Sequence, residues 1–158
     1  MLLSFFKAMG DLPFSKALGA SVWQFALIQA LHLVALAFFA GAVLIVDLRL
    51  MGKVLKDRPI AEISRSAQPW LIGGFLGLVV TGVPQLMQNA MREYYSELFW
   101  IKMVFIVLAL IFTMTLRRTV ALSDDARVVS FKTKAVGLVS MLLWLGVAAP
   151  ARLIGLFS

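Results

Sequence analysis

Cysteine is absent from this chain, and histidine occurs once among its 158 residues. The lack of cysteine excludes disulfides, thiolate metal sites and iron–sulfur clusters. The sequence also shows no nucleophile–base pair, no paired carboxylates and no phosphate loop, so hydrolysis and phosphoryl transfer are not expected. Any cofactor would have to bind through histidine, methionine, carboxylates or packing, and the sequence leaves open whether the protein is an enzyme.

Polar residues are also scarce, which identifies the solvent of the protein. Hydrophobic residues make up 61% of the chain and its mean hydropathy is +0.93, as in integral membrane proteins. Four apolar segments, at about 22–46, 70–90, 98–116 and 135–156, are each long enough to cross about 30 Å of hydrocarbon as a helix. None alternates apolar and polar residues as barrel strands do. The sequence therefore predicts an all-α fold, with residues 1–158 forming one four-transmembrane-helix bundle.

Basic residues are concentrated in two of the three predicted loops. The first and third loops carry ten of them, Arg49, Lys53, Lys56, Arg58, Arg65, Arg117, Arg118, Arg127, Lys132 and Lys134, whereas the second loop has only Arg92. This distribution predicts cytoplasmic first and third loops, and both termini on the outer, periplasmic side of a bacterial inner membrane. The net charge of +7 is expected to meet anionic lipid headgroups rather than nucleic acid, because no nucleic-acid motif accompanies it.

The helix ends give three further expectations. The N-terminal stretch is interrupted by charges and a proline, so we expect no cleaved signal but a short amphipathic helix on the outer surface. Its membrane-facing residues would be Leu2, Leu3, Phe5, Phe6 and Met9. Ser96 is expected to cap the third span, and Ser123, followed by Asp124 and Asp125, the fourth helix.

Small residues recur along the second span. Gly73, Gly77 and Thr81 are four residues apart, which predicts a packing seam within the chain or with another subunit of a homo-oligomer or larger membrane complex. Gln85 continues this stripe, and the neighbouring Pro84 cannot donate a hydrogen bond within the helix. The second span therefore offers the elements of a polar pocket.

Polar side chains gather in the outer half of the predicted bundle, whereas the inner half is expected to be almost wholly apolar. The candidate site residues are Gln29, His32, Gln85, Lys102, Arg152 and, near the membrane centre, Trp144. A neutral imidazole in hydrocarbon needs a partner for each ring nitrogen, supplied by a ligand or by a residue such as Gln85. The other members also have structural explanations: Lys102 and Arg152 would snorkel to headgroups, and Trp144 would pack in the core.

Three stretches carry a resemblance to known families. HLVALAFFAGAVLIVDLRLMG, from His32 on, together with FWIKMVFIVLAL at 99–110 and LLWLGVAAPARLIG at 142–155, resembles an uncharacterised family of bacterial four-helix inner-membrane proteins. The first-span histidine and the pattern Trp100-x-Lys102 are more remotely similar to copper-resistance D-type membrane proteins and HemJ-type protoporphyrinogen oxidases. Those relatives imply haem or copper handling, which carries over only to His32 and Lys102. The chain has no second histidine, so a bis-histidine haem within one subunit is excluded.

The first hypothesis is a haem b protein of the inner membrane. His32 would ligate the iron, Gln29 or a backbone carbonyl would orient its second nitrogen, and Lys102 and Arg152 would meet the propionates. Gln85 and Trp144 complete the expected cofactor surroundings. The sixth iron position would be empty, or filled by a methionine or by His32 of a second subunit. Electron transfer, with quinone as a candidate partner, is the expected reaction class.

Two alternatives remain at this point. The protein would be an accessory subunit without a cofactor if the glycine stripe docks onto a larger membrane complex and His32 is a hydrogen-bonded core residue. It would handle copper if Met87 and Met91, one helical turn apart, act with Met103 as soft ligands for Cu(I).

Overall fold

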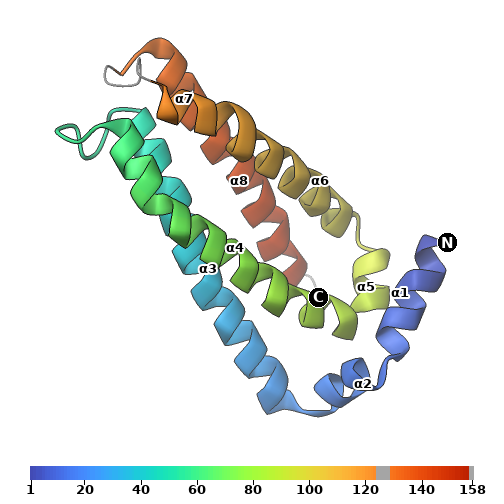
Figure 1. The fold of residues 1–158 in the computed structure, drawn as a ribbon. Helices are drawn as coiled ribbons and strands as arrows, with labels where there is room; N and C mark the ends of the chain where they lie inside the picture. Colours follow the sequence, from blue (N-terminus) through green and yellow to red (C-terminus); the bar gives the residue numbers. More distant parts are fainter. Residues whose placement is uncertain (124–128, 157–158) are drawn as a thin grey trace.

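The computed structural model describes residues 1–123 and 129–156, and each of the regular elements in these residues is a helix (Figure 1). Along the chain they are α1 (Leu2–Asp11), α2 (Pro13–Ala20), α3 (Val22–Leu50), α4 (Ile60–Gln88), α5 (Ala90–Tyr94), α6 (Glu97–Phe112), η1 (Thr113–Arg117), α7 (Arg118–Leu122) and α8 (Phe131–Leu156). The prediction of an all-α fold is confirmed.

Four helices are long and apolar enough to cross a membrane, as predicted, and they make this a multi-pass membrane protein. They are Val22–Leu50, Ile60–Gln88, Glu97–Leu122 and Phe131–Ile154. The third comprises α6, the five-residue π-helical turn η1 and α7. Helix α4 begins ten residues before the predicted apolar segment, because Ile60 and Ala67 are buried against the bundle and continue the helix toward the loop.

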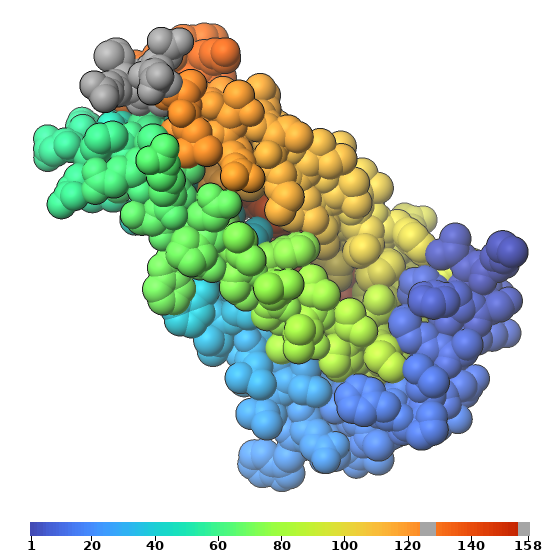
Figure 2. All heavy atoms as spheres, viewed as in Figure 1, coloured from blue at the N-terminus to red at the C-terminus, as the bar shows by residue number. Residues whose placement is uncertain are grey.

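The four spans are not packed equally against one another. Helix α3 packs against α4 and α8, and α6 packs against α8, whereas α4 and α6 have little direct contact. Figure 2 shows the result, a furrow between α4 and α6 at whose bottom atoms of α3 and α8 appear. Contacts of α4 with α7 and α5 bring the two walls together at its ends.

Small residues mark the closest approaches between the helices. A Cβ atom on Gly74 would lie 2.8 Å from the backbone of Phe39, and one on Gly137 would lie 2.8 Å from the carbonyl oxygen of Asp47. The third such approach brings Gly146 of α8 against the ring of Phe105 of α6. Close backbone approach at small residues is the packing mode expected of helices in lipid.

The predicted glycine stripe on α4 is divided between two environments. At Gly77 a Cβ atom would lie 2.9 Å from the Ala35 side chain of α3, so this glycine is part of a seam within the chain. At Gly73 the same atom would meet nothing within 4 Å. The neighbouring Gly74, rather than Gly73, makes the close contact with α3.

The N-terminal segment forms two short helices, α1 and α2, joined at Leu12, where we expected one. They lie across the end of the bundle where α4 leads into α5 (Figures 1 and 2). The prediction that Phe6 faces the membrane is wrong. This side chain is only 5% exposed and packs among Tyr94, Phe99 and Trp100. Phe5 remains 63% exposed. The aromatic cluster thus anchors α1 to the protein.

Of the two predicted helix caps, one is confirmed and one is wrong. Ser96 caps α6 as expected, because its hydroxyl accepts a hydrogen bond from the Phe99 amide at 3.4 Å. The prediction for Ser123 is wrong: this residue follows the end of α7, and its hydroxyl donates to the Val120 carbonyl. Helix α8 begins at Phe131, where Ser130 and Thr133 exchange side-chain and backbone hydrogen bonds. Asp124 and Asp125 lie outside the described residues.

Candidate functional site

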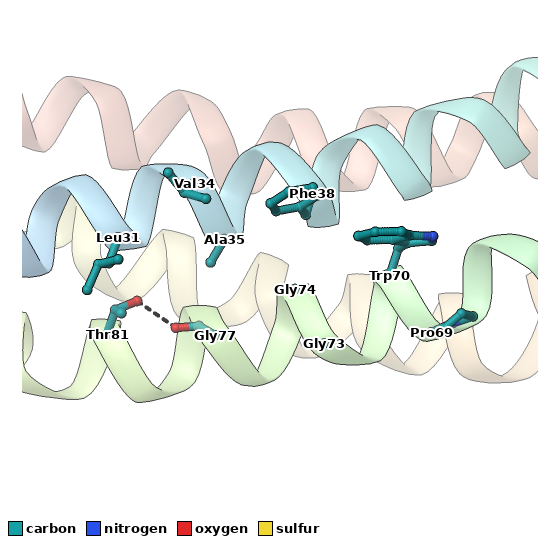
Figure 3. A pocket seen from close by; sticks show the side chains of 10 residues that line it. All are labelled: Leu31, Val34, Ala35, Phe38, Pro69, Trp70, Gly73, Gly74, Gly77 and Thr81. Atoms are coloured by element: carbon teal, nitrogen blue, oxygen red, sulfur yellow. Dashed lines mark hydrogen bonds between the residues drawn. The ribbon is translucent and has the colours of Figure 1, made fainter.

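The single histidine is held by a threonine of the neighbouring helix. His32 on α3 is half-buried, and its Nδ1 lies 2.7 Å from Oγ1 of Thr81 on α4. The Thr81 hydroxyl has one hydrogen, which it donates to the Gly77 carbonyl oxygen at 2.6 Å (Figure 3). The hydroxyl must therefore accept a hydrogen bond from His32, which assigns the proton of a neutral imidazole to Nδ1. The Nε2 atom then carries a lone pair and can act as a ligand.

Gly82 leaves room for the Nδ1–Cε1 edge of the imidazole beside Thr81, a role that sequence reasoning missed. A Cβ atom at this position would lie 3.3 Å from Cε1 of His32 and 3.8 Å from Nδ1. Any larger residue would press on the edge of the ring. The signal in the sequence was the glycine next to Thr81, but only the pairing of α3 with α4 shows which side chain it faces.

Lys102 of α6 lies within electrostatic range of the histidine. It is close enough for its charge to act on His32, and its Nζ lies 5.1 Å from the centroid of the Phe99 ring. Glu93 of α5 acts in turn on Lys102, and its Oε2 is buried with no hydrogen-bond partner among the described residues. Sequence reasoning missed Glu93, because nothing in its local spacing links it to Lys102.

The remaining predicted site residues do not converge on His32. Gln85 donates to the Thr81 carbonyl at 3.2 Å. It therefore shares Thr81 as a neighbour with the imidazole but does not bond to the imidazole itself. Trp144 packs on Phe39, with ring centroids 4.7 Å apart, and its Nε1 donates to Thr113 at 3.2 Å. Gln29 and Arg152 are exposed and make no hydrogen bond or ion pair to the part of the chain that the structure describes. Thr81 therefore orients the imidazole of His32, the role that we expected for Gln29.

The methionines proposed as copper ligands are spread between the end of α4 and α6. Met87 is half-buried, and its carbonyl oxygen accepts a hydrogen bond from Ser15 at 2.9 Å. Within residues 1–123 and 129–156, no three histidine, aspartate or glutamate side chains come together as a metal-binding group. His32 is the one imidazole that the chain has to offer a metal.

The half of the bundle away from α1 and α2, which we expected to be almost wholly apolar, contains a buried ion pair. Arg117 donates from Nε to Oδ1 of Asp47 at 2.6 Å and from a terminal nitrogen to the Val43 carbonyl at 3.1 Å. Both side chains of this ion pair are at most 4% exposed. The Ser140 hydroxyl lies beside the Asp47 carboxylate without a hydrogen bond of standard geometry. Arg117 is therefore an internal residue and does not contact lipid headgroups.

An apolar groove runs along the outside of the α3–α4 pair (Figure 3). Its volume is about 620 Å³, and its lining comprises Leu31, Val34, Ala35, Phe38, Pro69, Trp70, Gly73, Gly74, Gly77 and Thr81. The Phe38 and Trp70 rings stack with centroids 5.3 Å apart. Thr81 lines the groove and also bonds to His32, so one hydroxyl links this groove to the imidazole.

Comparisons with known proteins bear on the family. No curated protein and no solved structure is significantly similar to the chain. A family profile does match, over residues 13–158, which confirms the predicted resemblance to an uncharacterised family. The remoter resemblance to copper-resistance D-type and HemJ-type proteins stays a prediction. This four-span protein, with its threonine-bound histidine, therefore belongs to a family of unknown function (DUF6644).

Proposed function

We propose that the protein binds haem b through Nε2 of His32 and takes part in electron transfer. The observation that supports this best is the hydrogen bond of Nδ1 to Thr81, because Thr81 also donates to Gly77 and so leaves the Nε2 lone pair free. Metal-ligating histidines in proteins are held in this way by a partner on the second ring nitrogen. Haem, when bound, would supply one-electron exchange.

The residues around His32 would supply haem with one ligand atom and one charge partner. Lys102, whose charge reaches His32, is the residue that we assign to a propionate. A charge-assisted hydrogen bond of this kind contributes about 1.5–3 kcal/mol. Arg152 is exposed and Trp144 is bonded to Thr113, so we assign them weaker contributions, whereas Gln29, which is exposed, is assigned none. A second ligand to the iron would come from a methionine or from His32 of a second subunit, or would be absent.

An absorption spectrum of detergent-purified protein, expressed with ample haem supply, tests this proposal. We expect a Soret band that is lost in His32→Ala, because no other imidazole can substitute, and only weakened in Lys102→Met. Gln29→Ala serves as the matched control, since Gln29 lies one helical turn away and is exposed. A colourless wild-type protein would contradict haem binding. If this colourless protein retains copper and Met87→Leu loses it, the result would favour the copper-handling alternative.

A membrane quinone is the redox partner that we propose. The groove between α3 and α4 has about 620 Å³, within the usual size of small-molecule sites, and is lined by aromatic and small apolar residues with one hydroxyl. A quinone analogue added to the protein in lipid nanodiscs should bind with lower affinity in Trp70→Leu than in the wild type. Unchanged binding in this variant would place the quinone elsewhere or exclude it.

We propose further that the protein lies in the bacterial inner membrane with both termini outside. This rests on the ten basic residues of the first and third loops against Arg92 in the second. Reporter fusions after residues 58 and 125 should report a cytoplasmic location, and one after residue 94 an external location. The reverse pattern would place the His32 site in the inner half of the membrane.

The alternative function, an accessory subunit without a cofactor, is favoured by one observation, the open surface of α4 at Gly73. A second copy or a larger complex would pack there. The mass of the particle in nanodiscs tests this: Gly73→Leu should reduce a larger assembly to the 17.4 kDa chain. A wild-type particle that already contains a single chain would exclude a homo-oligomer.

A further inference from the structure

A basic pocket lies at the end of the bundle opposite to α1 and α2, away from the His32 site. It is formed where α3 ends, where the following loop turns toward α4, and where α8 begins (Figure 1). Its volume is about 300 Å³, and it is lined by Arg49, Met51, Gly52, Lys56, Val129 and Lys134. Three of these six residues are cations, and none is an acid.

The end of α3 gives this pocket its shape. The Gly52 amide donates to the Arg49 carbonyl and the Lys53 amide donates to the Leu48 carbonyl, which is the Schellman arrangement of a helix C-terminus. Gly52 has a φ of +71°, which favours glycine, and a Cβ atom there would lie 3.0 Å from Val129. The loop therefore leaves α3 in a fixed direction, close to the segment that leads into α8.

Arg49 is a buried cation with incomplete partners. Its side chain is 3% exposed, and Nε and one terminal nitrogen donate to the Arg58 carbonyl at 2.9 and 2.7 Å. The other terminal nitrogen is buried and has no hydrogen-bond partner among the described residues. Within that part of the chain no carboxylate pairs with Arg49 either. A buried charge normally has a counter-charge, so the arrangement calls for an anion.

Lys56 and Lys134 are the two further cations of the pocket. Both are exposed, and neither forms an ion pair with any described residue. Among the acids of the described part of these segments, Asp47 pairs with Arg117 and Glu62 pairs with Arg58, whereas Asp57 is exposed and forms no ion pair there. Two mobile ammonium groups beside one fixed guanidinium suit a small anion with several oxygen acceptors.

We propose that this pocket binds a phosphate group, with Arg49 as its buried anchor and Lys56 and Lys134 as its outer ligands. The pocket lies beyond the apolar part of α3, where a spanning helix meets the lipid headgroups. The phosphate therefore comes from an anionic phospholipid headgroup or from a free phosphate. The proposal is independent of haem binding.

The test compares two double variants with the same loss of charge. Lys56→Gln/Lys134→Gln removes the two outer ligands, whereas Lys53→Gln/Lys132→Gln removes two exposed cations of the same segments that do not line the pocket. Arg49 is left intact, because its bonds to the loop also hold the fold. One arm titrates inorganic phosphate into protein in neutral detergent and follows the melting temperature. The other counts phosphatidylglycerol retained by native mass spectrometry, with phosphatidylcholine as the neutral lipid.

We expect the pocket variant to bind on the order of tenfold more weakly than the wild type, and the control variant to bind like the wild type. A loss confined to phosphatidylglycerol would identify a lipid headgroup, and a loss in the phosphate arm would identify a free phosphate. Equal effects of the two double variants would show unspecific charge attraction and would overturn the proposal, as would wild-type protein that responds to neither probe.

Discussion

Asp47 and Arg117 form a buried ion pair that ties α3 to the π-helical turn η1. The Nε–Oδ1 distance is 2.6 Å, and the side chains are 0% and 4% exposed. The π-helical turn spans Thr113–Arg117, and its extra residue per turn changes the direction in which the following side chains point. Arg117 is therefore directed into the bundle, while the adjacent Arg118 is exposed.

The first prediction concerns this pair. Arg117→Met leaves Asp47 as an unpaired buried charge, which costs about 3–5 kcal/mol of stability. We expect a clearly lower melting temperature in detergent for this variant, while Arg118→Met, the exposed neighbour, melts like the wild type. The double variant Asp47→Leu/Arg117→Met should recover much of the loss, since no charge is then buried alone. Equal melting of Arg117→Met and Arg118→Met would contradict the pair.

The second prediction concerns the tautomer of His32. Because the chain has one histidine, the imidazole signals in a ¹⁵N spectrum of histidine-labelled protein belong to His32 without further assignment. We expect a protonated Nδ1 and an unprotonated Nε2 in the wild type and in Thr81→Ser. Thr81→Val removes the acceptor, so a mixture of tautomers should appear. A wild-type spectrum with the proton on Nε2 would remove the main support for metal ligation.

The third prediction compares two adjacent glycines of α4. Gly74→Ala places a methyl group against the backbone of Phe39, and such overpacking costs about 1–3 kcal/mol. Gly73→Ala meets open space and should leave stability unchanged or raise it by about 0.5–1 kcal/mol, because alanine is the better helix former. Melting temperatures in detergent measure the difference. A larger loss for Gly73→Ala would mean that this glycine packs against another subunit.

The fourth prediction concerns the attachment of α1. Phe6→Ala removes the side chain that packs among Tyr94, Phe99 and Trp100, so α1 should detach from the bundle. Hydrogen exchange in residues 2–11 would then become faster, while the spans remain protected. Phe5→Ala, which alters an exposed neighbour, is the control and should leave the exchange unchanged. Rapid exchange of these residues in the wild type would contradict the docking of α1.

Local features of the sequence determined the helical class and the number of spans, but not every helix boundary. Apolar runs of membrane-spanning length need no partner to be recognised, because the hydrophobic effect and backbone hydrogen bonding act within each segment. The cap at Ser96 was predictable for the same reason: its partner, the Phe99 amide, is three residues away. That His32 needs a hydrogen-bond partner followed from chemistry alone, since an imidazole in an apolar run is otherwise unsatisfied.

Partners distant in the sequence were decided only by the tertiary structure. Thr81 is 49 residues from His32, and Arg117 is 70 residues from Asp47, so neither pairing leaves a trace in local spacing. Gly73 and Gly74 are equally small, but the rotation of α4 against α3 turns one to open space and the other onto Phe39. Arg49 and Arg117 likewise look like loop cations in the sequence, because burial depends on how the ends of separate helices meet.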